Sequence, residues 1–288
     1  MATATEYPIT EEQARFYEEN GYIQLLGVLT PGELEQVRAA LDEVMAMQLD
    51  QQHDLSRGRP DYEKIFVQKV NLWQVHPGMR QYVFNPKLAE IARRLARATR
   101  IRLWHDHALV KMPGDSKPSA WHQDLPYWPM QESGALSCWM ALDDVNEANG
   151  CMAFVPGSHK FGRLEPIRLT DPQDLFSLVP AEARAGRELK GVFQPMPAGS
   201  CTFHNGLTFH YAGPNTTDRP RRAMITIYMP DGVHFNGADH VVTQDLDLHV
   251  GDVLAGERFP VLAEAEEAAG CVGVSPAVGS GRRVAAPR

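Results

Sequence analysis

Residues 101–111, "IRLWHDHALVK", decide the fold class, because apolar and polar side chains alternate along them. Alternation with a period of two is typical of a β-strand that buries one face. Short segments with the same pattern follow at 136–145, 151–155, 200–204, 207–213 and 221–229. Turn-forming stretches separate them, among them "PGDSKP" at 113–118 and "GPNTTDRP" at 213–220. Several short strands joined by turns predict an antiparallel sandwich or barrel.

The residues before this β region show helical signals instead. Thr10 and Gln13 are spaced as a capping box, and Thr30 and Glu33 repeat that spacing with a proline at the first helical position. Asn85, followed by a proline, marks a third helix start. We therefore expect helices over 10–20 and 30–49 and from residue 85, with 51–64 as a polar loop.

Two segments fit neither pattern. Residues 161–192 are polar and irregular, and an insertion of that length between strands is more often a functional rim or lid than an idle loop. The end of the chain, residues 264–288, is rich in Ala, Gly, Val and Ser and is expected to be a flexible tail. Residues 1–263 are then predicted to form one domain, with a β core and a helical N-terminal flank.

Composition limits the classes of partner. The 288 residues contain 28 Lys and Arg against 36 Asp and Glu, a net charge of −8, which argues against a nucleic-acid or anionic-membrane partner. No apolar run approaches the roughly 18–20 residues that span a bilayer. The N-terminus does not resemble a secretory signal. The four scattered cysteines (Cys138, Cys151, Cys201, Cys271) are expected to be free and buried, so a reducing, cytoplasmic location is expected. The oligomeric state is left open.

The stretch "WHQDLPYWP", residues 121–129, carries the first candidate site residues. His122 and Asp124 stand two positions apart, so on a strand both would point to one face. Two histidines and one carboxylate on one face are a common way to hold a metal that keeps open positions for catalysis. A lone H-x-D pair is a weak signal and needs a third ligand. His210, at the end of the apolar segment "LTFH", is the best candidate.

Other polar residues allow further interpretations. His105 and His107 form a rival H-x-H pair that would suit a cupin-like metal site, although packing roles are favoured for them. His204 is interpreted as structural. Arginine is costly at the start of an apolar strand unless an anion pairs with it, and its planar guanidinium suits a carboxylate. Arg221 is the preferred carboxylate ligand, with Arg219 and Arg222 as alternatives that the chemistry alone does not exclude.

These segments, in this order, resemble the phytanoyl-CoA dioxygenase family of non-haem iron(II), 2-oxoglutarate-dependent oxygenases. The resemblance rests on "HQDLPYWP", "NGCMAFVPGSHK" (149–160) and "HYAGPNTTDRPRRA" (210–223), and on the opening "EEQARFYEENGYIQLLGVLTPGELEQVRAAL". It extends over most of residues 7–263. It implies a mainly β fold: a double-stranded β-helix (jelly-roll, cupin-like) core with flanking N-terminal α-helices.

The resemblance also implies roles for individual residues. His122, Asp124 and His210 would be the iron ligands and therefore the catalytic centre. The residues implied to bind 2-oxoglutarate are Arg221, Lys69, Trp139 and His107, of which His107 departs from the apolar residue often found there. Ala212 stands where some members have a serine that bonds 2-oxoglutarate. Tyr127 and Trp128 are candidate walls of the substrate pocket.

The implied reaction uses iron(II), 2-oxoglutarate and O2 to oxidise a C–H bond of a small molecule, releasing succinate and CO2. The carboxylate of Asp124 favours hydroxylation over halogenation, because halogenating relatives lack it. Two other classes stay open: a cupin-like metal-dependent isomerase or epimerase without 2-oxoglutarate, and a non-catalytic jelly-roll binding protein. Arg221 separates the oxygenase from the isomerase, since only a dicarboxylate co-substrate calls for it. The full set of His122, Asp124, His210 and Arg221 argues against a binding protein, which has no need of all four. No residue selects a substrate among acyl-CoA thioesters, amino acids, alkaloids, terpenoids and polyketides.

Overall fold

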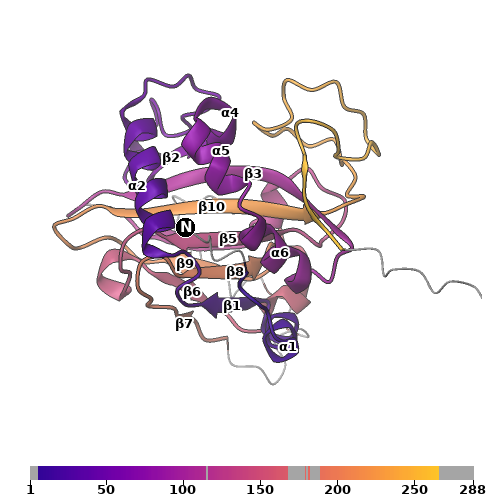
Figure 1. Ribbon diagram of the computed structural model, residues 1–288, viewed down its shortest axis with the longest axis horizontal. Helices are drawn as coiled ribbons and strands as arrows, with labels where there is room; N and C mark the ends of the chain where they lie inside the picture. The colour runs from indigo at the N-terminus through magenta and orange to yellow at the C-terminus, as the bar shows by residue number, and fades with distance from the viewer. Residues whose placement is uncertain (1–5, 115, 168–178, 180, 182–188, 266–288) are drawn as a thin grey trace, which may run out of the picture.

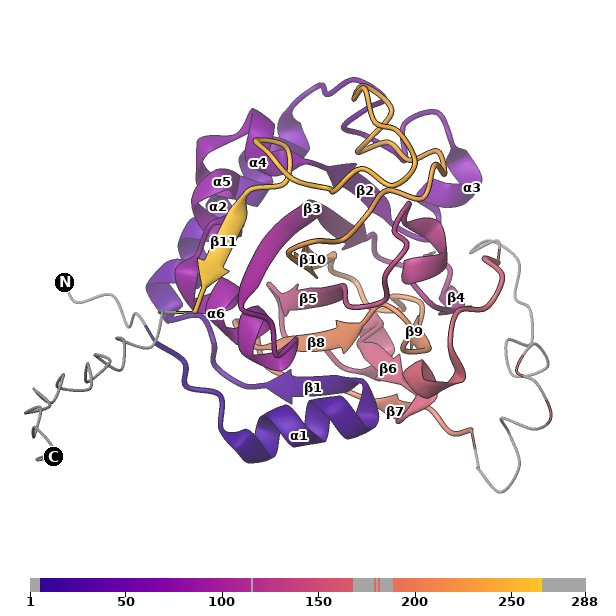
Figure 2. The same cartoon turned by 90° about the vertical axis from the view of Figure 1, so that its right-hand side faces the viewer.

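Two antiparallel sheets face each other across the centre of the computed structural model, which describes residues 6–114, 116–167, 179, 181 and 189–265 (Figures 1 and 2). The larger sheet has the order β1-β8-β5-β10-β3-β11, with β2 also paired to β3, and the smaller has the order β4-β9-β6-β7. The larger sheet consists of β1 (Tyr22–Leu25), β2 (Val67–Val70), β3 (Arg100–Lys111), β5 (Leu136–Ala141), β8 (Cys201–Asn205), β10 (Arg221–Pro230) and β11 (Val261–Glu264). The smaller sheet consists of β4 (Ser119–His122), β6 (Met152–Phe154), β7 (Val192–Phe193) and β9 (His210–Ala212). This is the jelly-roll core that the sequence predicts.

Alternation along the central strands separates two cores. On β10, Met224 and Tyr228 pack outward against the helices, whereas Ile225 and Ile227 pack inward toward the smaller sheet. On β5, Trp139 likewise faces inward. The period of two therefore gives the larger sheet one face for structural packing and one face for a site.

Helices cover the outer face of the larger sheet (Figure 2). The helices are α1 (Glu11–Asn20), α2 (Pro31–Ala46), α3 (Pro60–Glu63), α4 (Leu72–Val75), α5 (Pro77–Val83) and α6 (Pro86–Leu95). The three predicted helix starts are confirmed, and both capping boxes form, at Thr10 with Gln13 and at Thr30 with Glu33. The expected loop 51–64 contains α3, and α2 ends three residues before the predicted Leu49. Helices as short as α3, α4 and α5 have too few residues for a periodic stripe to be recognised.

Three 3₁₀ turns complete the described secondary structure: η1 (Leu125–Tyr127), η2 (Glu147–Asn149) and η3 (Ser158–Phe161). A β-bulge interrupts β3 at Trp104, because Ile227 of β10 pairs with His105 whereas Tyr228 pairs with Leu103. Residues 231–260, between β10 and β11, pass above β3 and beside β2 at one end of the sheets (Figure 2). Most of the predicted rim 161–192 and nearly all of the predicted tail 264–288 lie outside the described residues.

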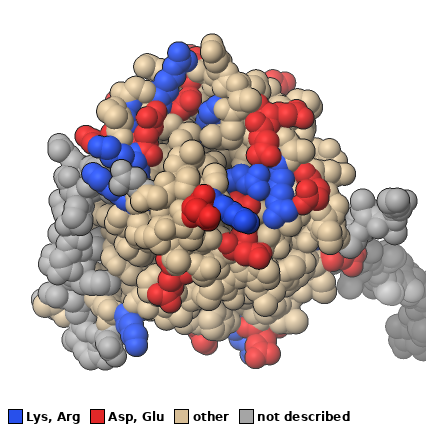
Figure 3. Space-filling view, turned by 90° about the vertical axis from the view of Figure 1, so that its left-hand side faces the viewer, with Lys and Arg blue, Asp and Glu red and all other residues tan. Residues whose placement is uncertain are grey.

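The described surface agrees with the composition. In the view of Figure 3, Lys and Arg side chains lie among Asp and Glu side chains and form no continuous basic field. Within the described ranges, no helix has the length and apolar character needed to cross a membrane. Cys138, Cys151 and Cys201 are free and buried, as expected, and Cys271 lies outside the described residues.

Candidate metal centre

His122, Asp124 and His210 come together in one pocket between the two sheets. Oδ1 of Asp124 lies 3.6 Å from Nε2 of His122 and 3.4 Å from Nε2 of His210. One ligand atom from each residue lies within 4.8 Å of the other two, which is the spacing of groups around a single ion. Two imidazole nitrogens and one carboxylate oxygen leave room for exchangeable ligands on a six-coordinate metal.

Two short strands and a turn build this arrangement. His122 on β4 and His210 on β9 are direct partners in the antiparallel register, and their ring centroids are 4.0 Å apart. Asp124 does not lie on β4, contrary to the expectation that both H-x-D residues share a strand. The strand ends at His122, and Asp124 adopts a helical conformation before η1. The turn, rather than strand alternation, directs the carboxylate toward the histidines.

Hydrogen bonds orient both histidine rings. Nδ1 of His122 donates to the carbonyl of Ala120 at 2.7 Å, and Nδ1 of His210 donates to the carbonyl of Thr208 at 3.0 Å. Each Nε2 atom therefore points to the centre, and in the neutral form of each ring it offers the lone pair that a metal requires. Burial, followed by the neighbouring His210, lowers the pKa of His122 to about 3. A neutral His122 is available to a metal at neutral pH.

Asp124 is held through its other oxygen. Oγ of Ser137 donates to Oδ2 of Asp124 at 3.0 Å, and Nε2 of His204 lies 3.2 Å from the same atom. Burial acts to raise the pKa of Asp124, but His210 and His204 outweigh it and hold this pKa well below its usual range. His204 is thus structural, as interpreted from the sequence. Its contact with Asp124, and that of Ser137, was not predicted, because β5, β8 and η1 meet only in the tertiary structure.

Arg221 is a buried cation that forms no ion pair with the described residues. It is 1% exposed, and its Nε and Nη1 atoms have no hydrogen-bond partner among the described residues. Its guanidinium carbon lies 5.1 Å from the centroid of the Trp139 ring, and both side chains line the pocket that contains the metal triad. Burial lowers the pKa of Arg221 to about 10, so it stays charged at neutral pH. A buried, unpaired charge of this kind requires an anionic ligand.

The other two arginines are excluded by their positions. Arg222 donates to both oxygens of Asp143 and pairs with Asp42 at 3.0 Å, so its charge is already compensated outside the pocket. Arg219 is exposed and does not line the pocket. The adjacent arginines of β10 point to opposite faces of the sheet.

Lys69, which was expected to help hold 2-oxoglutarate, does not line the cavity. Its ammonium donates to the carbonyls of Val44, Met45 and Met47 at 3.0–3.1 Å, at the end of α2. Lys69 pairs with Ala108, whose side chain packs in the outer core, so the register directs Lys69 away from the pocket. The side chain next to it, Gln68, faces the pocket instead. A lysine cannot be assigned to one face of a strand until the register is known.

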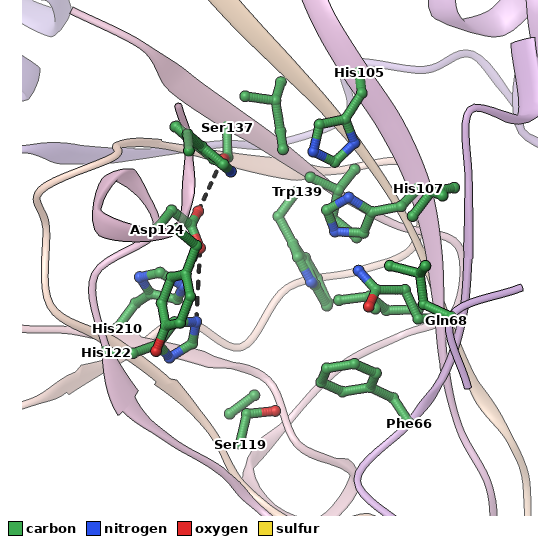
Figure 4. Close-up of a pocket in the computed structure, with 18 of the residues that line it drawn as sticks. Phe66, Gln68, His105, His107, Ser119, His122, Asp124, Ser137, Trp139 and His210 are labelled. Atoms are coloured by element: carbon green, nitrogen blue, oxygen red, sulfur yellow. Dashed lines mark hydrogen bonds and ion pairs between the residues drawn. The ribbon is translucent and has the colours of Figure 1, made fainter. Parts of the chain in front are cut away.

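The remaining predicted site residues line a cavity of about 240 Å³. Trp139 and His107 lie opposite the triad, across the cavity from Asp124 (Figure 4). Tyr127 and Trp128 line the cavity beside the triad. The hydroxyl of Tyr127 bonds the backbone of Ile167, so only its ring is available to the cavity. Ala212 also lines the cavity and offers no hydrogen-bonding side chain there.

Comparison with known proteins assigns this architecture to a family. Residues 17–223 match the phytanoyl-CoA dioxygenase (PhyH) family. The chain is 26% identical over 244 residues to human peroxisomal phytanoyl-CoA dioxygenase, covering 80% of this chain and 69% of the human protein.

Two solved structures from nogalamycin biosynthesis are also similar. The 2-oxoglutarate-dependent carbocyclase SnoK superimposes with a TM-score of 0.72 at 31% identity, covering 88% of this chain and 97% of SnoK. The epimerase SnoN, solved with Fe3+, 2-oxoglutarate and nogalamycin RO, gives a TM-score of 0.70 at 29% identity, covering 88% of this chain and 98% of SnoN. The chain belongs to the phytanoyl-CoA dioxygenase family and is an iron- and 2-oxoglutarate-dependent dioxygenase.

Proposed function

We propose that this enzyme oxidises an unactivated C–H bond of a small-molecule metabolite, most simply by hydroxylation, with iron bound by His122, Asp124 and His210. The observation that carries the proposal is the pairing of this triad with the unpartnered guanidinium of Arg221 in one cavity. A cupin-like isomerase that does not use 2-oxoglutarate has no dicarboxylate for this arginine to bind, and a non-catalytic binding protein has no need of the triad and the arginine together.

Arg221 is proposed to bind the far carboxylate of 2-oxoglutarate. The flat ring of Trp139, 5.1 Å from the guanidinium carbon, restricts the guanidinium from one side. His107 lines the cavity beside Trp139 and completes the proposed co-substrate site (Figure 4). Because Lys69 is hydrogen-bonded to the end of α2, Arg221 is proposed to bind the carboxylate without help from a lysine.

The chain's residues divide the work of catalysis. Iron(II) with 2-oxoglutarate and O2 supplies an oxidant strong enough for a C–H bond, with succinate and CO2 as the co-substrate's products. Asp124 and the two histidines would hold the iron, and Ser137 and His204 hold the orientation of the carboxylate. The rings of Tyr127 and Trp128 are proposed to position the substrate and to exclude water. The cytoplasm is the proposed compartment, which cell fractionation would test.

The decisive experiment is an anaerobic titration of the iron(II)-loaded protein with 2-oxoglutarate. Chelation produces a weak visible charge-transfer band, and its growth gives a dissociation constant. Arg221→Ala removes the only cation that lines the described cavity, so we expect at least 100-fold weaker binding. Arg222→Ala is the matched control: it removes an adjacent arginine that points away from the cavity and should leave binding within twofold.

Two outcomes would contradict the proposal. No band with the wild-type protein, or an unchanged dissociation constant in Arg221→Ala, would remove the co-substrate assignment. Full hydroxylation by Asp124→Ala would remove the ligand assignment. Succinate release, screened against a metabolite collection, would then identify the substrate.

A further inference from the structure

Two histidines in the cavity have no part in the proposed metal or co-substrate sites. His105 lies on β3, and His240 belongs to residues 231–260, which join β10 to β11. Their ring centroids are 5.7 Å apart, and both residues line the cavity that contains the metal triad. Figure 4 shows His105 on the far side of the cavity from His122 and His210. We call His105 and His240 the distal histidine pair.

The fold holds this pair firmly. The bulge in β3 turns both Trp104 and His105 toward the inside of the sheet. The Trp104 ring stacks on Phe259 at 5.2 Å and lies 5.3 Å from the ring of His240. The rings of Trp104, His105 and His240 therefore pack against one another, with all three centroid distances between 5.3 and 5.9 Å. Side chains packed on rings in this way keep one orientation, which suits the recognition of a ligand.

The proposed contacts of 2-oxoglutarate with Arg221, Trp139 and His107 do not include the distal histidine pair. Arg221 pairs with Lys111 at one end of β3, and His105 stands six residues along the strand, about 20 Å at roughly 3.3 Å per residue. The guanidinium extends toward Trp139, which shares its row of the sheet with His107. His105 lies in the next row, about 7 Å further along the strand. The pair therefore adjoins the proposed co-substrate site without belonging to it, because the ring of His105 lies 5.3 Å from the ring of His107.

The hydrogen bonds of the pair leave one acceptor and one donor for a ligand. Nδ1 of His240 accepts from the amide of Val242 at 3.2 Å, so Nε2 of His240 carries the hydrogen. Nδ1 of His105 donates to the carbonyl of Asp106 at 3.3 Å, so Nε2 of His105 is an acceptor. Neither Nε2 atom has a partner among the described residues. Burial lowers the pKa of His240 to about 4 and that of His105 well below its usual value, so both rings are neutral.

A hydroxyl group matches this pattern. An alcohol or phenol donates one hydrogen bond and accepts another at the same oxygen, whereas a carboxylate can only accept. A neutral imidazole also gives no counter-charge to an anion. Arg221 is the sole Lys or Arg among the described residues that line the cavity, and the proposed function assigns it to 2-oxoglutarate.

Aromatic side chains line other parts of the same cavity. Tyr62 and Phe66 meet edge to face at 5.1 Å and line the cavity, as does the buried Trp128. Aromatic side chains give broad contact to a flat or apolar ring. A thioester of coenzyme A would bring several phosphate charges, for which the described lining offers no cation beyond Arg221.

We propose that the substrate is an uncharged, ring-bearing molecule with a hydroxyl group, and that the distal histidine pair binds this hydroxyl. The proposal deepens the proposed function and rests on it. The hydroxyl would donate to Nε2 of His105 and accept from Nε2 of His240. The substrate is thereby held across the cavity from the triad, with its polar group turned away from the metal.

The test uses small probes with the iron(II)- and 2-oxoglutarate-loaded protein under anaerobic conditions. Phenol, toluene and benzoate share a ring and differ in one substituent: a hydroxyl, a methyl and a carboxylate. Ligand-observed NMR titrations give their dissociation constants. We expect phenol to bind at least tenfold more tightly than either toluene or benzoate. Equal binding of phenol and toluene, tighter binding of benzoate, or no detectable phenol binding would overturn the proposal.

Variants of the two histidines test whether a preference for phenol over toluene arises from the distal histidine pair. His105→Phe and His240→Phe keep a flat ring but remove the hydrogen-bonding nitrogens, and each should reduce the phenol-to-toluene ratio to within twofold of one. His240→Gln keeps an amide donor and should retain part of the preference. The control is His249→Phe, which changes an exposed histidine of the same 231–260 segment and should leave the ratio unchanged.

The proposed function and the role of the distal histidine pair can be contradicted separately. All of these variants should bind 2-oxoglutarate within twofold of wild type, as read from the charge-transfer band. A normal band with an unchanged phenol-to-toluene ratio in both phenylalanine variants would overturn the role of the pair alone. The absence of the band in the wild-type protein would instead contradict the proposed function. If His105→Phe fails to fold, His240→Phe decides, because residue 240 lies outside the strands.

Discussion

Ser137 and His204 lie directly opposite each other on β5 and β8, and both contact the same oxygen, Oδ2 of Asp124. The other oxygen, Oδ1, is left to face the two histidines of the triad. The larger sheet thereby fixes a carboxylate that belongs to a turn beside the smaller sheet. Groups that orient metal ligands in this way commonly affect metal affinity as strongly as some ligands do.

Ser137→Ala should weaken iron binding. Loss of the 3.0 Å hydrogen bond frees one oxygen of Asp124, and changes to such supporting groups typically cost about 10–100-fold in metal affinity or activity. Competition with a chromophoric chelator measures the iron dissociation constant. Ser119→Ala is the control, because Ser119 lines the same cavity without a hydrogen bond to Asp124. Equal affinities for the two variants would remove the supporting role of Ser137.

Lys69→Met should lower stability without affecting the co-substrate. The substitution removes three hydrogen bonds to the end of α2 and leaves their carbonyl acceptors unpaired, at a cost of about 2 kcal/mol in the free energy of unfolding. Urea denaturation measures this loss. The 2-oxoglutarate dissociation constant should stay within twofold of wild type. A tenfold increase would show that Lys69 does contribute to co-substrate binding.

Asp106 should make stability depend on pH. Burial raises its pKa to about 7, against the amides of Leu72 and Trp73, which donate to its carboxyl group. The folded protein then keeps a proton that the unfolded chain releases near its ordinary value of 3.8. The stabilisation that this proton gives the folded protein is complete below about pH 4 and is lost as the pH rises to 7. The free energy of unfolding then falls with a limiting slope of roughly 1.4 kcal/mol per pH unit.

The measurement for Asp106 is a set of urea unfolding curves between pH 4 and 8. Asp106→Asn cannot titrate, so the stability difference between wild type and variant should shift in favour of the variant as the pH rises. Asp61→Asn, at an exposed position of α3, serves as the control and should show no such trend. A difference that is constant across this range would show that Asp106 is ionised throughout.

Gly150→Ala should destabilise the strand that carries His210. Gly150 has φ of +81°, and a β-carbon there would lie 2.5 Å from the carbonyl oxygen of Gly213, which directly follows β9. The clash adds to the backbone strain, for a total loss of about 2–3 kcal/mol in unfolding free energy. Gly232→Ala, with φ of +87° and open space around it, should show the strain alone, about 1 kcal/mol. Equal losses in thermal or urea unfolding would refute the clash.

The fold was predictable where one physical signal dominated. Strand alternation on 101–111 and 221–229 predicted β3 and β10, and side-chain capping at Thr10, Thr30 and Asn85 predicted three helix starts. The short elements α3, α4 and α5 were missed, because a single turn of helix gains its stability from tertiary packing rather than from its own sequence. The bulge at Trp104 was missed for a similar reason, since only the pairing with β10 defines it.

The sequence by itself determined the residue types of the centre: two histidines, a carboxylate and a later arginine, in an order typical of one family. The tertiary structure decided which of their neighbours take part. The register of β2 on β3 turned Lys69 toward α2, and the packing of β10 separated Arg221 from Arg222. The meeting of β5, β8 and η1 brought Ser137 and His204 to Asp124. The reason is physical: a residue's identity fixes which bonds it can make, whereas strand register and packing between distant segments fix which partners it meets.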